Sequence, residues 1–166
     1  LAVFRSNNHI YAQIIDDTLS LRDKYAPNAK VSVLSNATFL HRSDTFEALK
    51  KVDNNILKLD TVDMPFINLV NQPNCKYDVA KVIEQMKAFE GDIIIQTMFI
   101  KGEYQGKQLD NTGSEFVEPW IAQLKEINPQ QVMIYTLDRD TPVEGLVKAS
   151  KEDLDKIGDH LKELVF

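Results

Sequence analysis

The chain has 166 residues and a formal net charge of −6, from 19 basic and 25 acidic side chains scattered along it. This is about the length of one domain, and no basic patch indicates nucleic-acid binding. No apolar run approaches the roughly 20 residues of a membrane-spanning helix, and no signal-peptide pattern is present, so we expect no membrane contact. Cys75 is the only cysteine, which excludes a disulfide framework and predicts a cytoplasmic setting.

Strands and helices are predicted to alternate along the chain. The opening run, LAVF, is compatible with a short strand, and we expect the chain to be a piece of a longer protein. Helices are predicted from apolar residues at helical spacing and strands from compact β-branched runs. After the opening run, the predicted elements are helix 9–25, strand 31–36, helix 42–52, strand 55–61, helix 76–89, strand 92–102, helix 113–127, strand 131–138 and helix 150–165.

Capping residues mark the starts of two of these helices. Ser43 or Asp44 is the expected N-cap of helix 42–52, because short polar side chains accept hydrogen bonds from the free N–H groups of the first turn. Ser150 is the expected N-cap of the last helix, with Glu152 or Asp153 behind it.

The alternation predicts βαβ units, a parallel sheet and right-handed connections. Two closures fit this pattern: an open doubly wound sheet, or part of a βα barrel. Segment 101–113 contains three glycines and few apolar residues. It follows a strand, so we expect a long binding loop at the carboxyl end of the sheet.

Polar residues fall on one face of the predicted strands. Side chains alternate along a strand, so Lys58 and Asp60 share a face, and Asn36 and Gln96 occupy comparable positions on other strands. These positions lie toward the carboxyl ends of the strands, where ligands bind in parallel α/β folds. Buried charges need partners. The four residues are therefore candidate ligand-binding residues, although Lys58 and Asp60 are equally well explained as a pair that serves the fold.

Other reactive residues give weaker signals. His9, His41 and His160 are too widely spaced to indicate a metal site, and Cys75 has no companion cysteine. Segment 136–142, TLDRDTP, fits either a ligand-contacting turn or a solvated one. The chain has no glycine-rich phosphate loop, no HExxH and no GxSxG motif. We therefore name no catalytic residue and no metal ligand within this chain.

Four segments taken together resemble the middle and later strands of radical S-adenosylmethionine (radical SAM) proteins. The nearest group is related to molybdenum-cofactor-biosynthesis, wyosine-type and glycyl-radical-activating enzymes, and the resemblance covers roughly residues 14–166. SNA stands where that family often has a Thr-Asn-Gly-like turn, and KLD where it places charged residues near the methionine end of the cofactor. The segments are KVSVLSNATFL, NILKLDTVD, IIIQTMFIKG and QVMIYTLDRDTP.

The resemblance implies a fold, two cofactors and a role for the candidate residues. The fold would be one domain, 1–166, forming a partial parallel (βα) barrel of about four to five βα units, open on one side. In the full-length protein, S-adenosylmethionine and a [4Fe–4S] cluster would generate a 5′-deoxyadenosyl radical. Asn36, Lys58, Asp60 and Gln96 would line the cofactor side. The substrate, whether a protein, an RNA or a small molecule, is not indicated.

The sequence departs from the family at two motifs. It has no CxxxCxxC run to hold the cluster and no Gly-Gly-Glu-Pro-like turn, so we expect this chain alone to bind neither cofactor productively and to be inactive. Two alternatives stay open: a cluster-free α/β binding module, and an unrelated barrel enzyme that uses Lys58 as a Schiff-base amine. An open sheet edge near residues 2–5 would favour self-association.

Overall fold

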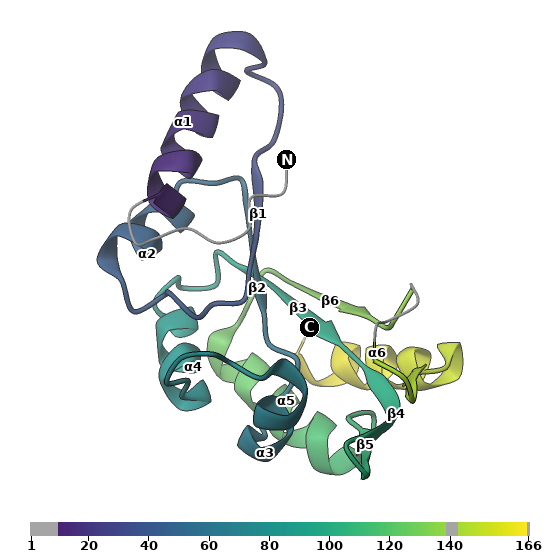
Figure 1. Ribbon diagram of the computed structural model, residues 1–166. Coiled ribbons are helices and arrows are strands. Elements are labelled where there is room, and N and C mark those ends of the chain that lie inside the picture. Colours follow the sequence, from purple (N-terminus) through teal and green to yellow (C-terminus); the bar gives the residue numbers. More distant parts are fainter. Residues whose placement is uncertain (1–9, 139–142, 166) are drawn as a thin grey trace.

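The computed structural model describes residues 10–138 and 143–165 (Figure 1). The opening run LAVF, His9, the edge at residues 2–5 and most of the predicted turn 136–142 therefore lie outside the described residues. The elements are α1 (Ile10–Tyr25), β1 (Ser32–Ser35), α2 (Ser43–Leu49), β2 (Asn54–Lys58), α3 (Met64–Phe66), the π-helix η1 (Ile67–Asn71), α4 (Val79–Lys87), β3 (Ile94–Met98), β4 (Ile100–Tyr104), β5 (Lys107–Asp110), α5 (Ser114–Ile127), β6 (Gln131–Tyr135), β7 (Leu146–Lys148) and α6 (Lys151–Val165).

A four-stranded parallel sheet forms the centre of the fold, as the alternation of elements predicted. Its strands lie in the order β1-β2-β3-β6. In register, Ser35 lies beside Leu57, Leu57 beside Ile95, and Ile95 beside Val132. Spatial neighbours thus follow chain order without a reversal, and the described strands do not close into a barrel.

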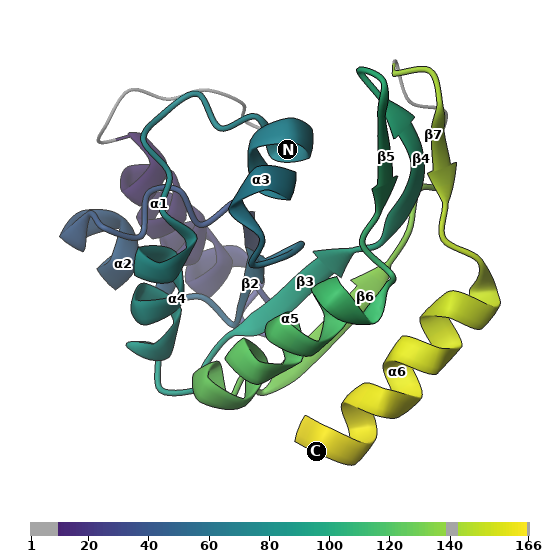
Figure 2. The same ribbon diagram turned by 90° about the horizontal axis from the view of Figure 1, so that it is seen from below.

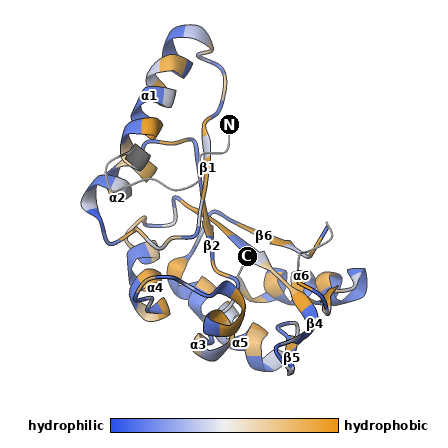
Figure 3. Cartoon of the chain, viewed as in Figure 1, coloured by the Kyte–Doolittle hydropathy of each residue, from blue (hydrophilic) through white to orange (hydrophobic). Residues whose placement is uncertain are grey.

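One face of this sheet is packed against the helices. Leu57 and Ile95 are fully buried and share a core with Met86 of α4 and Leu124 of α5. The helices supply this core because each has apolar residues on one side and polar residues on the other, and Figure 3 shows hydrophobic and hydrophilic residues along α4 and α5. Figure 2 shows α5 lying along β3 and β6.

The opposite face of the sheet lies outside this core. Leu34 is 56% exposed and Met133 is 37% exposed. Ile56 lies beside Leu34 in register and Ile94 beside Ile56, and both are also absent from the cluster that the helices cover. Among the described residues, the sheet therefore has one helix-covered face and one helix-free face, on which apolar side chains reach the surface.

The predicted binding loop 101–113 is instead part of a second, antiparallel sheet. Its strand order is β5-β4-β7, and Figure 2 shows these strands standing beyond the ends of β3 and β6. Gln105 and Gly106 both have positive φ angles, of 52° and 71°. They form the two-residue turn that hairpins favour. Polar strand residues and scattered glycines concealed this hairpin in the sequence, and the predicted strand 92–102 is in fact divided at Phe99.

Of the two predicted helix caps, one is confirmed and the other is wrong. Ser150 precedes α6, its hydroxyl accepts a hydrogen bond from Asp153 N (3.1 Å), and Asp153 Oδ2 accepts one from Ser150 N (2.9 Å). This reciprocal cap was predicted correctly. The N-cap of α2 is Arg42, without a side-chain cap bond. Ser43 and Asp44 lie inside the helix, where Asp44 forms an ion pair with Arg42 at 2.7 Å, so that prediction was wrong.

Within residues 10–138 and 143–165, none of the helices combines the length and apolar character needed to cross a bilayer.

Candidate functional site

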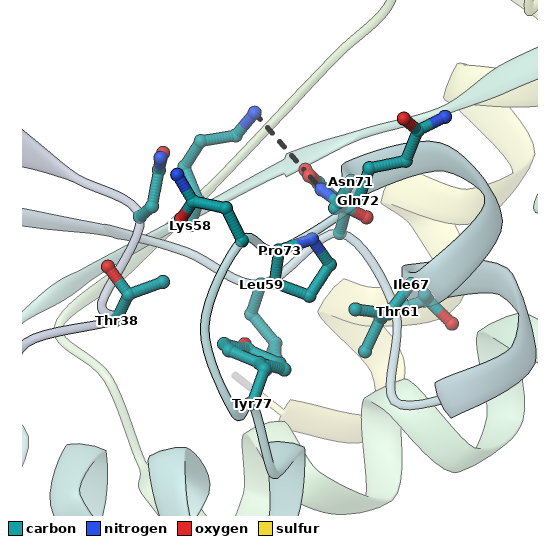
Figure 4. A pocket seen from close by; sticks show the side chains of 12 residues that line it. Thr38, Lys58, Leu59, Thr61, Ile67, Asn71, Gln72, Pro73 and Tyr77 are labelled. Carbon is teal, nitrogen blue, oxygen red and sulfur yellow. Dashed lines mark hydrogen bonds and ion pairs between the residues drawn. The ribbon is translucent and has the colours of Figure 1, made fainter.

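A cavity of about 410 Å³ opens where β1 and β2 end (Figure 4). Asn36 and Thr38 follow β1, Lys58 is the last residue of β2, and residues 59–61 follow it. The opposite wall comes from η1 and the loop after it, up to Tyr77. The cavity thus lies at the carboxyl end of the parallel sheet, where the candidate residues were expected.

Lys58 and Asp60 form an ion pair beside this cavity. Lys58 Nζ lies 3.4 Å from Asp60 Oδ2, and the two side chains are 23% and 6% exposed. Burial by itself would lower the pKa of Lys58, but the Asp60 charge and the Tyr135 hydroxyl outweigh it, and the pKa is raised. The Lys58 amine is therefore a protonated cation at neutral pH.

Asp60 is also held by two hydrogen bonds from the protein. Its Oδ1 accepts from Met98 N at 2.9 Å, and its Oδ2 accepts from Asn71 Nδ2 at 3.0 Å. These bonds connect the end of β2 to β3 on one side and to η1 on the other. Lys58 and Asp60 therefore do form an ion pair within the fold. The sequence had allowed such a structural pair as the alternative to a ligand-binding role.

Asn111 is an organising residue that the sequence analysis missed. It is fully buried. Its Nδ2 donates to the carbonyl oxygens of Met98 (2.9 Å) and Asp60 (3.2 Å), and its Oδ1 accepts from Ile100 N (2.8 Å). A buried amide with three satisfied bonds fixes the strand ends relative to one another. In the sequence it was one more polar residue in an apparent loop, with no signal to distinguish it.

The π-helix η1 forms the far wall of the cavity. Gln72 N donates to Ile67 O at 3.1 Å, a five-residue step, and Gln72 has a φ of 44°. This geometry turns Asn71 toward Asp60 and lets Gln72 Nε2 donate to Tyr104 Oη at 3.0 Å. Figure 4 shows Asn71 and Gln72 across from Lys58. Single-turn π-helices occur often at functional sites.

Tyr77 supplies a neutral hydroxyl at the floor of the cavity. Burial, with smaller contributions from Asp60 and Cys75, raises the pKa of Tyr77 to about 12. Cys75 itself is exposed. Tyr77 therefore keeps its proton throughout the physiological range.

The structure brings three of the four predicted residues together and places the fourth beside them. Asn36, Lys58 and Asp60 line the cavity, whereas Gln96 does not. Gln96 is the β3 neighbour of Lys58 in register, on the helix-free face. Its Oε1 is buried and has no hydrogen-bond partner among the described residues.

The remaining reactive residues do not converge on the site. His160 Nε2 lies 2.8 Å from Glu118 Oε1 at the surface, and the ring of His41 lies near that of Phe39. Across the described ranges, no group of three histidine, cysteine or acidic side chains is arranged to hold a metal ion.

Comparisons with known proteins give partial similarities. No protein-family model matches the chain. It is 24% identical over 137 residues to the GTPase Obg of Brachyspira hyodysenteriae, a match that covers 80% of this chain and 19% of that protein. It is 55% identical over 42 residues to the large ribosomal subunit protein uL18 of Synechocystis, which covers 23% of this chain and 35% of that protein. The chain thus spans about a fifth and a third of the lengths of these relatives.

Proposed function

We propose that this chain forms the later strands of a radical SAM enzyme core, arranged as a partial (βα) barrel. The observation that carries the proposal is a parallel sheet in chain order whose helix-free face presents Lys58 beside Gln96. A barrel has neighbouring strands in chain order and helices only outside. A doubly wound sheet reverses its strand order and has helices on both faces. The fold and the sequence resemblance therefore favour the same family.

The residues on this face fit the amino-acid end of S-adenosylmethionine. That end carries an ammonium and a carboxylate group. Lys58 is a protonated donor for the carboxylate, and Gln96 Oε1 is a buried acceptor without a partner among the described residues. Asn36 offers further donors at the mouth of the cavity. In this proposal the cofactor supplies the reactive group, and these residues bind and orient it.

The described residues do not fit an iron–sulfur cluster. Such a cluster requires several cysteine thiolates. Cys75 is the only cysteine in the sequence, and it is exposed. The proposal therefore requires the ligands of the cluster to come from sequence that precedes Leu1 in a longer protein.

The second candidate function is a binding module that uses the same scaffold without radical chemistry. The observation that favours it is the satisfied state of Asp60, whose partners are Lys58, Asn71 and the Met98 amide. Schiff-base chemistry is less well supported, because a reactive lysine needs a lowered pKa and that of Lys58 is raised. We do not propose GTP hydrolysis either, because the sequence lacks the phosphate-binding loop GxxxxGK[ST].

The complete reading frame provides the first test. We expect three cysteines spaced CxxxCxxC upstream of Leu1, and bound iron and sulfide after anaerobic reconstitution of that longer protein. A frame that begins near Leu1, without these cysteines, would support the binding module instead.

S-adenosylmethionine binding to the reconstituted longer protein provides the second test. By equilibrium dialysis, Lys58→Met and Gln96→Leu should each weaken binding about tenfold, which corresponds to the loss of one or two polar contacts. Lys87→Met on α4 is the matched control, because Lys87 pairs with Glu84 and Glu126 away from the cavity. Equal affinity in all four proteins would contradict the assigned cofactor side.

A further inference from the structure

The cavity has a chemical character that the proposed cofactor residues do not explain. Of the described residues that line it, only Lys58 and Asp60 carry formal charges, and they neutralise each other at 3.4 Å. Tyr77 stays protonated because burial raises its pKa to about 12. Lys58 is assigned to the proposed cofactor and Asp60 is paired with Lys58, so the described lining offers a second ligand no unpaired charge. A charged group of that second ligand would lose its hydration in the cavity without a counter-ion.

The other polar groups around the cavity are amides and hydroxyls. Within the parts of the chain that the structure describes, Thr38 and Asn74 line the cavity, form no side-chain hydrogen bond and are not assigned to the cofactor. Asn71 and Gln72 each direct an amide nitrogen to a protein acceptor, so each keeps a carbonyl oxygen as an acceptor. Amides and hydroxyls supply donors and acceptors side by side, as a ligand hydroxyl requires.

Apolar surface lies next to these groups. Leu59 and Ile67 are 2% and 5% exposed and line the cavity together with Pro73 and the Tyr77 ring. Figure 4 shows Pro73 above Tyr77, with Leu59 between Lys58 and Ile67. A volume of about 410 Å³ lies in the range of small-molecule sites, roughly 300–1,000 Å³.

We infer that this cavity binds a neutral sugar moiety, free or as part of a nucleoside. A sugar presents several hydroxyl groups around a ring whose faces are apolar, which matches a neutral wall of amides and hydroxyls beside apolar surface. The ligand is distinct from the proposed cofactor. The inference rests on the proposed function only in assigning this ligand the place of the substrate.

Uridine is a suitable probe because it carries hydroxyl groups and a flat ring but has neither charge nor adenine. Titration of the 166-residue chain, followed by NMR shifts of residues 58–61 and 71–77, should show saturable binding. Uridine 5′-monophosphate should bind at least fivefold more weakly, because the cavity has no unpaired cation. No saturable shift up to 20 mM uridine (on the order of the weakest specific binding), or tighter binding of the phosphate, would overturn the inference.

Two wall variants separate this site from the proposed cofactor side. Thr38→Val and Asn74→Ala remove polar groups that line the cavity but were not assigned to the cofactor, and each should weaken uridine binding at least threefold. Asn68→Ala, an exposed change on η1 outside the cavity lining, should leave it unchanged. Equal losses in all three variants would indicate disturbance of η1 and contradict the assigned contacts.

A competition experiment with S-adenosylmethionine and uridine distinguishes failure of this inference from failure of the proposed function. In the reconstituted longer protein, S-adenosylmethionine and uridine should bind together. If S-adenosylmethionine displaces uridine, the cavity belongs to the cofactor, and the inference fails while the proposed function stands. If uridine binds and the longer protein contains no iron, the proposed function fails and the sugar site stands.

Discussion

Lys58 and Asp60 contribute unequally to the fold, although they form one ion pair. Asp60 is almost fully buried and accepts hydrogen bonds from Met98 N and Asn71 Nδ2. Lys58 retains access to water and can reach the cavity. At the scale of single residues, the carboxylate therefore has the larger structural role, and the amine has more freedom to contact a ligand.

This asymmetry predicts different costs for removing the two side chains. Asp60→Ala leaves a buried N–H and a partly buried ammonium without partners and should lower the free energy of unfolding by about 3 kcal/mol. Lys58→Met also removes the counter-charge of a buried carboxylate, but Asp60 keeps both hydrogen bonds, so the cost should be smaller, about 1 to 2 kcal/mol. Urea unfolding measures both changes, with Asp92→Ala at an exposed position as the control. Equal costs for the two variants would contradict the assignment.

Asp153 predicts an acid-sensitive component of stability. Hydrogen bonds from Ser150 and Lys101 lower the pKa of Asp153 from 3.8 to about 2. Because the folded-state pKa lies below the ordinary value, the ionised carboxylate stabilises the fold above about pH 4. That contribution is lost as the pH falls through about 2.

Asp153→Asn should therefore flatten the pH dependence of unfolding between about pH 4 and pH 2. Thermal unfolding at a series of pH values measures the slope. Asp155→Asn is the control, because Asp155 lies on the same helix but pairs with Lys151 and not with the cap. The same slope in Asp153→Asn and the unmodified chain would refute this assignment.

At the scale of secondary-structure elements, the antiparallel sheet packs against α3 and α5. Ile100 and Leu109 form a small core with Phe66 of α3, and Phe66 contacts Phe116 of α5 edge to face, with ring centroids 5.3 Å apart. Tyr104 also reaches Gln72 at the rim of the cavity. The hairpin therefore supports η1, and through η1 it supports the wall that faces Lys58.

Two glycines of this sheet should respond differently to the same substitution. Gly102 has a φ of 120°, and an added Cβ would overlap the carbonyl oxygen of Gly145 in the adjoining segment. Gly106 has a φ of 71° and nothing near its Cβ position. Gly102→Ala should cost about 3 kcal/mol or more through strain and overlap, and Gly106→Ala about 1 kcal/mol through backbone conformation alone.

Chemical denaturation of the two glycine variants checks this order. The Tyr104–Gln72 contact gives a second readout, because loss of the β4–β7 pairing should shift the NMR signals of residues 71–77 in Gly102→Ala only. Similar losses in the free energy of unfolding for the two variants would contradict this prediction, because they would mean that the segment around Gly145 shifts to accommodate the added Cβ.

At the scale of the molecule, helices cover only one face of the parallel sheet among the described residues. Leu34 and Met133 lie exposed on the helix-free face, and β1 ends the order of the described strands. Edge strands and apolar patches of this kind promote association.

The isolated chain should therefore self-associate as its concentration rises. Sedimentation velocity should show a shift from monomer toward larger species, and Leu34→Lys and Met133→Lys should reduce it at least threefold. Leu164→Lys on α6, where Leu164 is 39% exposed, should have little effect. A monomer at all concentrations, or equal effects of the three variants, would contradict association through this face.

The alternation of elements and most of the polar cluster could be predicted from the sequence. Helical and strand periodicities identified α1, α4, α5, α6 and the parallel strands, because these patterns are local. The shared face of Lys58 and Asp60 followed from strand geometry alone, and the cap at Ser150 followed from two nearby residues. Ser43 and Asp44 were mistaken for the cap of α2 because they are the short polar residues at its start, whereas the cap position is occupied by Arg42, whose side chain makes no cap bond.

Contacts between distant segments were decided by the tertiary structure alone. Asn111 bonds to Asp60 across 51 positions of the sequence, and the β4–β7 pairing joins segments separated by β5, α5 and β6. The π-helix that turns Asn71 toward Asp60 leaves no periodic signal in five residues. The sequence of each strand by itself determined which face carries its polar residues. Long-range hydrogen bonding decided which of them meet, because partners remote in sequence impose no pattern on either segment.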